Sequence, residues 1–243
     1  MSLFVSSLNL ALSEAGAESS FTPMAMFQTA SLPNKGIILI LVFLLLLQIY
    51  TAVERGLMYL SSNSASQKFL KLFMDTLRRG DFEAAKRAAT THNKSHIALV
   101  LKHGLDIFQY EKQLKALHEN HDVIQPVERA IVRGTAEVTE LLKKGMLPLA
   151  TIGALAPFIG LLGTVIGIIK VFSDLKTKGA GDINALAGSI GEALGTTALG
   201  LIVAIPAVWI YNLYTAKQDQ VVTNINNAAS QMIDEFIRRE SQA

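Results

Sequence analysis

The chain has 243 residues, half of them hydrophobic, and only 17% of its residues are charged. Its mean hydropathy of +0.35 is typical of membrane proteins and argues against most soluble classes. The formal net charge of +2 is too small to indicate a nucleic-acid partner, and the sequence has no cysteine for disulfides or thiolate metal ligands.

The first 35 residues are predicted to form a periplasmic N-terminal segment. Its first half has no basic region, and Ser, Asn and Glu interrupt its apolar run, which argues against a secretory signal peptide. We interpret this half as a retained amphipathic segment that lies on the membrane surface. Its apolar side would consist of Phe4, Val5, Leu8, Leu10 and Leu12.

A first membrane crossing is predicted at residues 36–52, GIILILVFLLLLQIYTA. Bulky aliphatic side chains make up most of this run, and Gln48 is its one strongly polar residue. Such uniform bulk suits a helix that faces lipid, because helix-packing faces in membranes are enriched in small residues.

Residues 53–146 are predicted to form a cytoplasmic helical domain. We place its helices at about residues 66–79, 81–91, 95–120 and 124–144. Gly80 would end the first of these helices in the left-handed conformation, and Asp81 would cap the second.

The third and fourth of these helices are predicted to be amphipathic, because apolar residues recur at helical spacing. In the third helix these residues are Ile97, Leu101, Leu105 and Phe108. In the fourth helix they are Val127, Ile131, Val138 and either Leu141 or Leu142.

Two further crossings are predicted at residues 147–172 and 185–214, joined by a short periplasmic loop at 173–184. Each arm is long enough to span the hydrocarbon core, which takes about 20 helical residues, so the two form a helical hairpin. Residues 215–243 are predicted to form a cytoplasmic C-terminal helix that packs on the middle domain. Its apolar residues in helical phase are Val221, Ile225, Met232, Phe236 and Ile237.

The distribution of Lys and Arg predicts the orientation of the chain. Residues 53–147 contain 15 of the 22 basic residues, whereas the first 36 residues contain only Lys35. Basic residues are enriched on the cytoplasmic side of membrane proteins. The predicted fold is therefore an all-α membrane protein with three transmembrane helices, a cytoplasmic helical bundle and a periplasmic N-terminus.

The hairpin is unusually rich in small residues, and six glycines are predicted to mediate close packing. They are Gly153, Gly160, Gly163, Gly167, Gly195 and Gly200. Three of them follow one another at seven-residue spacing, and close backbone approach at such stripes drives helix association in lipid. The stripes either hold the three helices of one subunit together or also serve neighbouring copies and a partner helix. We favour the second interpretation.

Three threonines of the hairpin, Thr164, Thr196 and Thr197, place hydroxyl groups at mid-membrane depth. Each hydroxyl can simply bond to the carbonyl four residues back, which belongs to Gly160, Glu192 and Ala193 in turn. Together, the three can instead order water, stabilise a partner's carboxylate or coordinate a hard cation such as sodium.

Glu192 is the single carboxylate of the third crossing. A carboxylate in a membrane helix is costly unless it is paired or faces water, and by default it marks an ion pathway. Bonding to a neighbouring subunit is the alternative explanation. Pro157 and Pro206 are candidate helix hinges, because a proline inside a helix frees the carbonyl four residues before it.

No pattern indicates an enzyme or a bound cofactor. The pairs His92/His96 and His118/His121 lack neighbouring carboxylates in a known ligand arrangement, so no metal site is expected apart from the threonine cluster. The sequence has no Walker loop, which makes ATP an unexpected energy source.

Two stretches of the hairpin, GALAPFIGLLGTVIGI and IGEALGTTALGLIVAIPAVWIYN, closely resemble the MotA/TolQ/ExbB proton-channel family, and particularly its ExbB and TolQ branch. The predicted layout of three crossings with a large first cytoplasmic loop matches this family as well. The resemblance therefore extends from about Gly36 onward.

The resemblance implies a homopentamer in a bacterial inner membrane. It also implies that the pentamer encloses a dimer of an ExbD- or TolR-type partner, whose single membrane helix supplies an Asp that binds and releases the ion. Matched by motif, Thr164 and Thr197 would face this Asp, and Glu192 would lie near the pathway. The resemblance implies that the motor uses the proton gradient for TonB-type uptake, Tol-type envelope function or gliding.

Thr196 stands where many ExbB sequences have Ala. Sodium-driven stators of the wider family resemble this chain in having paired hydroxyls there, and a third oxygen ligand favours a hard cation. The expected transported ion is the proton, and sodium is the alternative. A passive membrane scaffold, in which the threonines only pack helices, is the alternative of another class.

Overall fold

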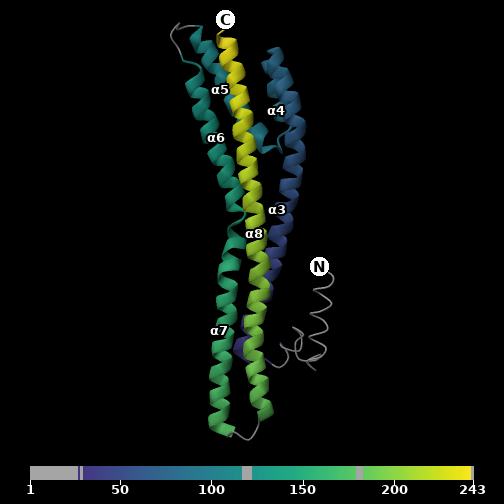
Figure 1. The fold of residues 1–243 in the computed structure, drawn as a ribbon, viewed down its shortest axis with the longest axis vertical. Helices are drawn as coiled ribbons and strands as arrows, with labels where there is room; N and C mark the ends of the chain where they lie inside the picture. Colours follow the sequence, from purple (N-terminus) through teal and green to yellow (C-terminus); the bar gives the residue numbers. More distant parts are fainter. Residues whose placement is uncertain (1–26, 28–29, 117–121, 179–182, 242–243) are drawn as a thin grey trace. The chain divides into compact units, whose positions relative to one another are not determined.

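The computed structural model describes residues 27, 30–116, 122–178 and 183–241, with the backbone alone at 177–178 and 183–187. Every regular element in this part of the chain is a helix (Figure 1). The helices are α3 (Leu32–Arg79), α4 (Phe82–Thr91), α5 (His96–Lys115), α6 (Ile124–Lys144), α7 (Leu147–Lys178) and α8 (Ile183–Glu240). The predicted all-α class is confirmed.

Three stretches of the described residues are helical, long and apolar enough to cross a membrane: Leu32–Arg79, Ile124–Lys176 and Gly188–Glu240. The chain is therefore a multi-pass membrane protein, as predicted. The placement of its ends on the periplasmic and cytoplasmic sides stays a prediction.

The chain divides into two compact units, and the three points of division fall within α3, at the start of α7 and within α8. The hairpin unit comprises Met1–Ile49 and Pro148–Trp209, and the bundle unit comprises Tyr50–Leu147 and Ile210–Ala243. The predicted boundaries of the crossings and of the cytoplasmic segments, at residues 52, 146 and 214, stay predictions.

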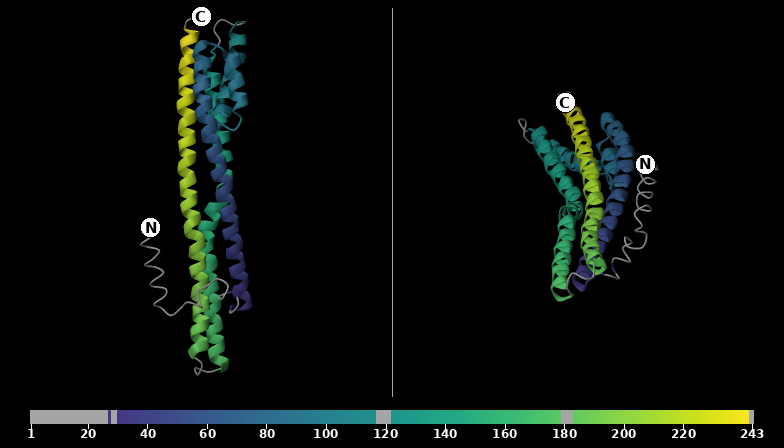
Figure 2. Two further views of the ribbon diagram at one scale, coloured as in Figure 1. Left: turned by 90° about the vertical axis from the view of Figure 1, so that its right-hand side faces the viewer. Right: turned by 60° about the horizontal axis from the view of Figure 1, so that its bottom comes forward.

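The core of the hairpin unit is built from α3, α7 and α8. Its buried apolar side chains are Ile37, Leu41, Ile152, Ala156, Val203, Ala204 and Ala207. Figures 1 and 2 show α7 and α8 side by side in this unit. On the opposite faces, large apolar side chains such as Phe43, Phe158 and Ile205 are exposed, which suits contact with lipid.

The core of the bundle unit is built from α4, α5 and α6 and from the C-terminal parts of α3 and α8. Within it, α5 contacts both α4 and α6. The four apolar residues predicted to lie on one face of α5 are all buried. In α6 the choice left open by the sequence falls on Leu142, which is buried, whereas Leu141 is exposed. In α8, Ile225, Met232 and Phe236 are buried as their phase predicts, but Ile237 is exposed.

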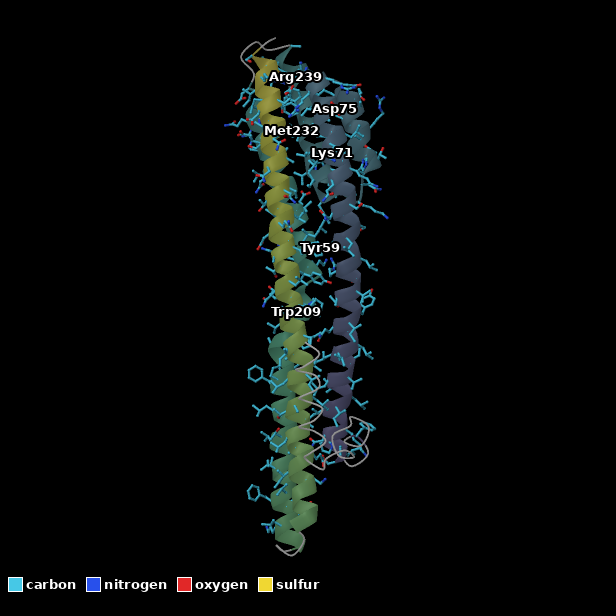
Figure 3. All side chains as sticks on the ribbon, turned by 45° about the vertical axis from the view of Figure 1, so that its right-hand side comes forward. Tyr59, Lys71, Asp75, Trp209, Met232 and Arg239 are labelled. Carbon is cyan, nitrogen blue, oxygen red and sulfur yellow. The ribbon has the colours of Figure 1, made fainter. Side chains whose placement is uncertain are left out.

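The junction between α3 and α4 has the predicted turn. Gly80 has a φ of +82°, in the left-handed region that favours glycine, and Asp81 accepts a hydrogen bond from the Ala84 amide at 2.8 Å. Arg239 of α8, labelled in Figure 3, donates to the carbonyl oxygens of Leu77 at 3.0 Å and Arg78 at 2.6 Å. These donors satisfy the last turn of α3, where carbonyl groups lack helical partners.

Residues 66–79 are not a separate helix, because α3 continues from the first crossing through SSNSAS to Arg79. Serine is a weak helix former, but tertiary contacts compensate at two of these positions. Ser62 shares a hydrogen bond of 2.6 Å with His96, and Ser66 shares one of 2.8 Å with Ser95. Burial lowers the pKa of His96 below its ordinary value.

Other helix ends also differ from the sequence-based prediction. Helix α5 ends at Lys115 rather than near residue 120. Helix α7 extends to Lys178 and α8 begins at Ile183, so much of the predicted loop at 173–184 is helical. The N-terminal amphipathic segment and the pair His118/His121 lie outside the described residues.

Candidate functional site

Helices α7 and α8 meet along a seam where glycine allows backbone to touch backbone. A Cβ atom added at Gly160 would lie 2.8 Å from the Thr196 carbonyl oxygen and 3.1 Å from the Cα atoms of Thr197 and Gly200. At Gly200 it would lie 2.7 Å from the Ala156 carbonyl oxygen. These distances are too short for any side chain, and the neighbours are backbone atoms that cannot rotate away.

The other α7 glycines face the same seam. A Cβ at Gly153 would lie 2.6 Å from a Val208 methyl group, one at Gly167 would lie 2.5 Å from the Ala193 Cβ, and one at Gly163 would contact the Thr196 hydroxyl. The glycines with seven-residue spacing thus pack α7 against α8 within one subunit, which both interpretations allow. A role of the same stripes toward neighbouring copies and a partner helix stays a prediction. Gly195 is also buried.

The seam brings the three predicted threonines together. The hydroxyl groups of Thr164 and Thr197 hydrogen-bond to each other across the two helices. Thr164 also lies 3.0 Å from the Ala193 carbonyl oxygen, and Thr197 lies 3.2 Å from that of Gly160. The predicted bonds of Thr164 and Thr197 to their own fourth-preceding carbonyls are therefore replaced by contacts between helices.

The Thr164–Thr197 pair has two arrangements of donors, because each hydroxyl carries one proton and two acceptor lone pairs. In one arrangement Thr197 donates to Thr164, which donates to Ala193. In the other, Thr164 donates to Thr197, which donates to Gly160. The pair can therefore reverse its direction without moving either helix. Both side chains are half-buried, so one side of the pair is open.

Thr196 is placed differently from the other two threonines. It is fully buried, and its hydroxyl donates to the Ala193 carbonyl oxygen at 2.7 Å and lies 3.3 Å from that of Gly160. Its side chain fills the space that Gly163 leaves open. Within the described structure Thr196 is therefore a packing residue of the seam.

Glu192 of α8 is almost fully buried and lies beside the N-terminal end of α3. One carboxylate oxygen accepts hydrogen bonds from the Ser31 amide and hydroxyl, both at 2.8 Å, and from the Asn34 side-chain amide at 2.7 Å. The other oxygen forms an ion pair of 3.4 Å with Lys170 of α7. An ionised carboxylate is a strong acceptor of such bonds, so Glu192 joins all three helices of the hairpin unit.

The two candidate hinge prolines lie inside continuous helices, Pro157 in α7 and Pro206 in α8. The structure adds four residues that sequence reasoning left without a role. Ser31, Asn34 and Lys170 contact Glu192, and Gln48 contacts α8 near Pro206. Only Gln48 gave a signal, as the one strongly polar residue of its crossing.

No group of three or more His, Asp or Glu that could hold a metal ion occurs among the described residues. Of the predicted histidine pair in the bundle unit, His92 contacts the Ala88 carbonyl oxygen at 2.9 Å and His96 contacts Ser62. The His92 ring therefore contacts the end of its own helix, and the His96 ring forms a contact between α5 and α3.

The sequence of this chain is similar to that of a known protein family. Residues 93–227, which include the whole seam, match the model of the MotA/TolQ/ExbB proton channel family. A biopolymer transport protein ExbB of Xanthomonas campestris is 42% identical over 110 residues, which is 45% of this chain and 44% of that protein.

Two further relatives have the same description. ExbB of Neisseria gonorrhoeae is 53% identical over 77 residues, covering 32% of this chain and 35% of that protein. ExbB of Salmonella typhimurium is 35% identical over 115 residues, covering 47% of each chain. The aligned segment thus spans less than half the length of each of these relatives.

Proposed function

Because this chain belongs to the MotA/TolQ/ExbB proton channel family, we propose that it is the ion-channel subunit of an inner-membrane motor that uses the proton gradient to drive a periplasmic partner. The observation that carries this proposal is the hydroxyl contact between Thr164 and Thr197 at the α7–α8 seam. A reversible hydroxyl pair with one open side suits the passing of a proton to and from a titrating group of another molecule.

The burial and hydrogen bonding of Thr196 favour the proton over sodium as the transported ion. A sodium site needs several oxygen atoms that converge on one open point. The Thr196 hydroxyl is buried and directed at backbone carbonyls of the seam, whereas the Thr164–Thr197 pair is half-exposed. Two hydroxyl groups are enough to relay a proton, but they supply too few oxygen ligands to coordinate a sodium ion.

The proposed assembly is a homopentamer around a dimer of an ExbD- or TolR-type partner, whose membrane helix supplies the titrating Asp. The exposed apolar faces of α3, α7 and α8 supply surface for lipid and for neighbouring copies. The three relatives are biopolymer transport proteins, which favours TonB-type uptake over Tol-type envelope function or gliding as the process that this motor drives.

The test is to reconstitute the protein with its single-crossing partner in liposomes and to record proton flux under an imposed potential, with and without sodium. Thr197→Val removes one hydroxyl of the pair while keeping its shape. The matched control is Thr215→Val, because Thr215 is an α8 threonine that bonds only its own fourth-preceding carbonyl, that of Tyr211, at 3.0 Å.

We expect flux without sodium that Thr197→Val abolishes and Thr215→Val preserves. Flux that requires sodium and falls in Thr196→Ala would contradict the proposed proton motor and indicate a sodium-driven motor instead. If the wild-type complex carries no flux and the Thr197→Val complex assembles and keeps its function, the passive scaffold is favoured, in which these hydroxyls only pack helices.

A further inference from the structure

Gln48 is a polar side chain on the inward face of a membrane-spanning helix. It follows Ile37 and Leu41 at helical spacing, and both of these residues belong to the apolar core of the hairpin unit. Only 2% of Gln48 is exposed. A carboxamide buried in this core is costly unless its donor and acceptor are both satisfied.

Both ends of the Gln48 carboxamide find a partner on α8. The orientation assigned from these partners has the amide nitrogen donating to the Val203 carbonyl oxygen at 2.9 Å. In the same orientation the amide oxygen accepts from the Ala207 backbone N–H at 3.3 Å. One side chain of α3 therefore contacts the donor and the acceptor of a single helical turn.

That turn is the one interrupted by Pro206. In an uninterrupted helix the Ala207 N–H bonds to the Val203 carbonyl oxygen. Pro206 lies between these residues, provides no N–H, and its ring crowds the carbonyl of Ile202, which loosens the turn. Gln48 supplies a donor and an acceptor at the turn where Pro206 removes a hydrogen bond from the α8 backbone.

We propose that Gln48 is a positioning residue that bridges the Pro206 turn of α8 and thereby sets the direction of the helix segment that bears Thr196 and Thr197. These threonines lie about two and a half turns before the proline. A change in helix direction at Pro206 therefore moves the hydroxyl pair relative to α7. The functional consequence rests on the proposed channel function, whereas the bridge itself does not.

A simple packing role for Gln48 makes a different prediction. Leucine has a similar size and suits a core of Ile, Leu and Ala side chains, so Gln48→Leu would then be harmless or stabilising. If Gln48 acts through the proline turn, the effect of Gln48→Leu depends on whether residue 206 is proline.

The experiment is a double-mutant cycle with Gln48→Leu, Pro206→Ala and the double variant. It is read out in two ways: the unfolding midpoint in detergent, and proton flux with the partner in liposomes. Gln220→Leu, at an exposed glutamine of α8, controls for replacing an amide by an apolar side chain. A cycle isolates the coupling between two sites when their separate effects do not add.

We expect Gln48→Leu alone to lower both readouts, with flux reduced about three- to tenfold, as befits one or two hydrogen bonds between membrane helices. In the Pro206→Ala background the same substitution should change flux by less than about twofold, because a complete helical ladder no longer needs the bridge. Additive effects, or an unchanged midpoint in Gln48→Leu, would overturn the proposal. Coupling in the midpoint without any proton flux would support the bridge and reject the channel function.

Discussion

Asn34 donates a hydrogen bond of 2.7 Å to the Glu192 carboxylate, so a fully buried amide in the first turn of α3 holds that turn to α8. Together with the Ser31 amide and hydroxyl, it gives one carboxylate oxygen three donors. Three hydrogen-bond donors to one oxygen restrict the movement of the Glu192 carboxylate. This geometry favours an anchoring role for Glu192 over that of a mobile ion carrier.

Asn34→Ala should therefore destabilise the hairpin unit. A hydrogen bond to a charged group contributes about 1.5–3 kcal/mol, and the free energy of unfolding in detergent should fall by this amount. The matched control is Asn63→Ala, because Asn63 lies on the same helix but is exposed. Equal stability of the two variants would contradict an anchoring role for the Asn34–Glu192 bond.

Gly160→Ala should separate α7 from α8. The added methyl group meets the Thr196 carbonyl oxygen at 2.8 Å and two Cα atoms at 3.1 Å, and overpacking of this kind costs about 1–3 kcal/mol. The comparison is Gly191→Ala in α8, where nothing lies within 4 Å of the added atom. Thermal unfolding in detergent should distinguish the two, with a lower midpoint for Gly160→Ala only.

Phe236→Ala should destabilise the bundle unit strongly. Phe236 is fully buried and stacks on Phe108 with ring centroids 3.7 Å apart, and removing a buried phenylalanine costs about 3–5 kcal/mol. The adjacent Ile237 is about half exposed, so Ile237→Ala should have a much smaller effect. If limited proteolysis of the bundle unit proceeds equally fast in both variants, the tail of α8 does not belong to this core.

The stability of the bundle unit should fall as the pH decreases below about 6.5, the ordinary pKa of histidine. Burial lowers the pKa of His96 in the folded protein, so below this pH the unfolded chain binds the proton more readily than the folded one. The contribution of neutral His96 is fully present above the unfolded pKa and is lost as the pH falls toward the folded one. Unfolding midpoints between pH 8 and pH 5 measure this slope, and His96→Gln should flatten it. An identical slope in the variant would assign the pH dependence to other groups.

The sequence was most informative where a pattern has one physical meaning. The seven-residue spacing of Gly153, Gly160 and Gly167 predicts a close-packed helix face, and the structure has that face against α8. The turn at Gly80 and Asp81 was equally predictable, because few residues adopt a positive φ or cap a helix well.

Contacts between distant residues could not be predicted in the same way. The sequence indicated that Glu192 needs partners, but not that Ser31 and Asn34, some 160 positions earlier, supply them. The continuity of α3 was missed for a related reason. A serine-rich stretch has weak helix propensity, and the contacts with Ser95 and His96 that offset it depend on the tertiary fold.

The glycine seam also limits where charge can cross the membrane. With the Gly160 and Gly200 backbones in van der Waals contact, the space between α7 and α8 at this depth is too narrow for water. A single copy therefore has no water-filled path between these two helices at the level of the two glycines. Any conducting path must therefore run outside the α7–α8 pair, and monomers reconstituted alone should not raise the electrical conductance of a bilayer.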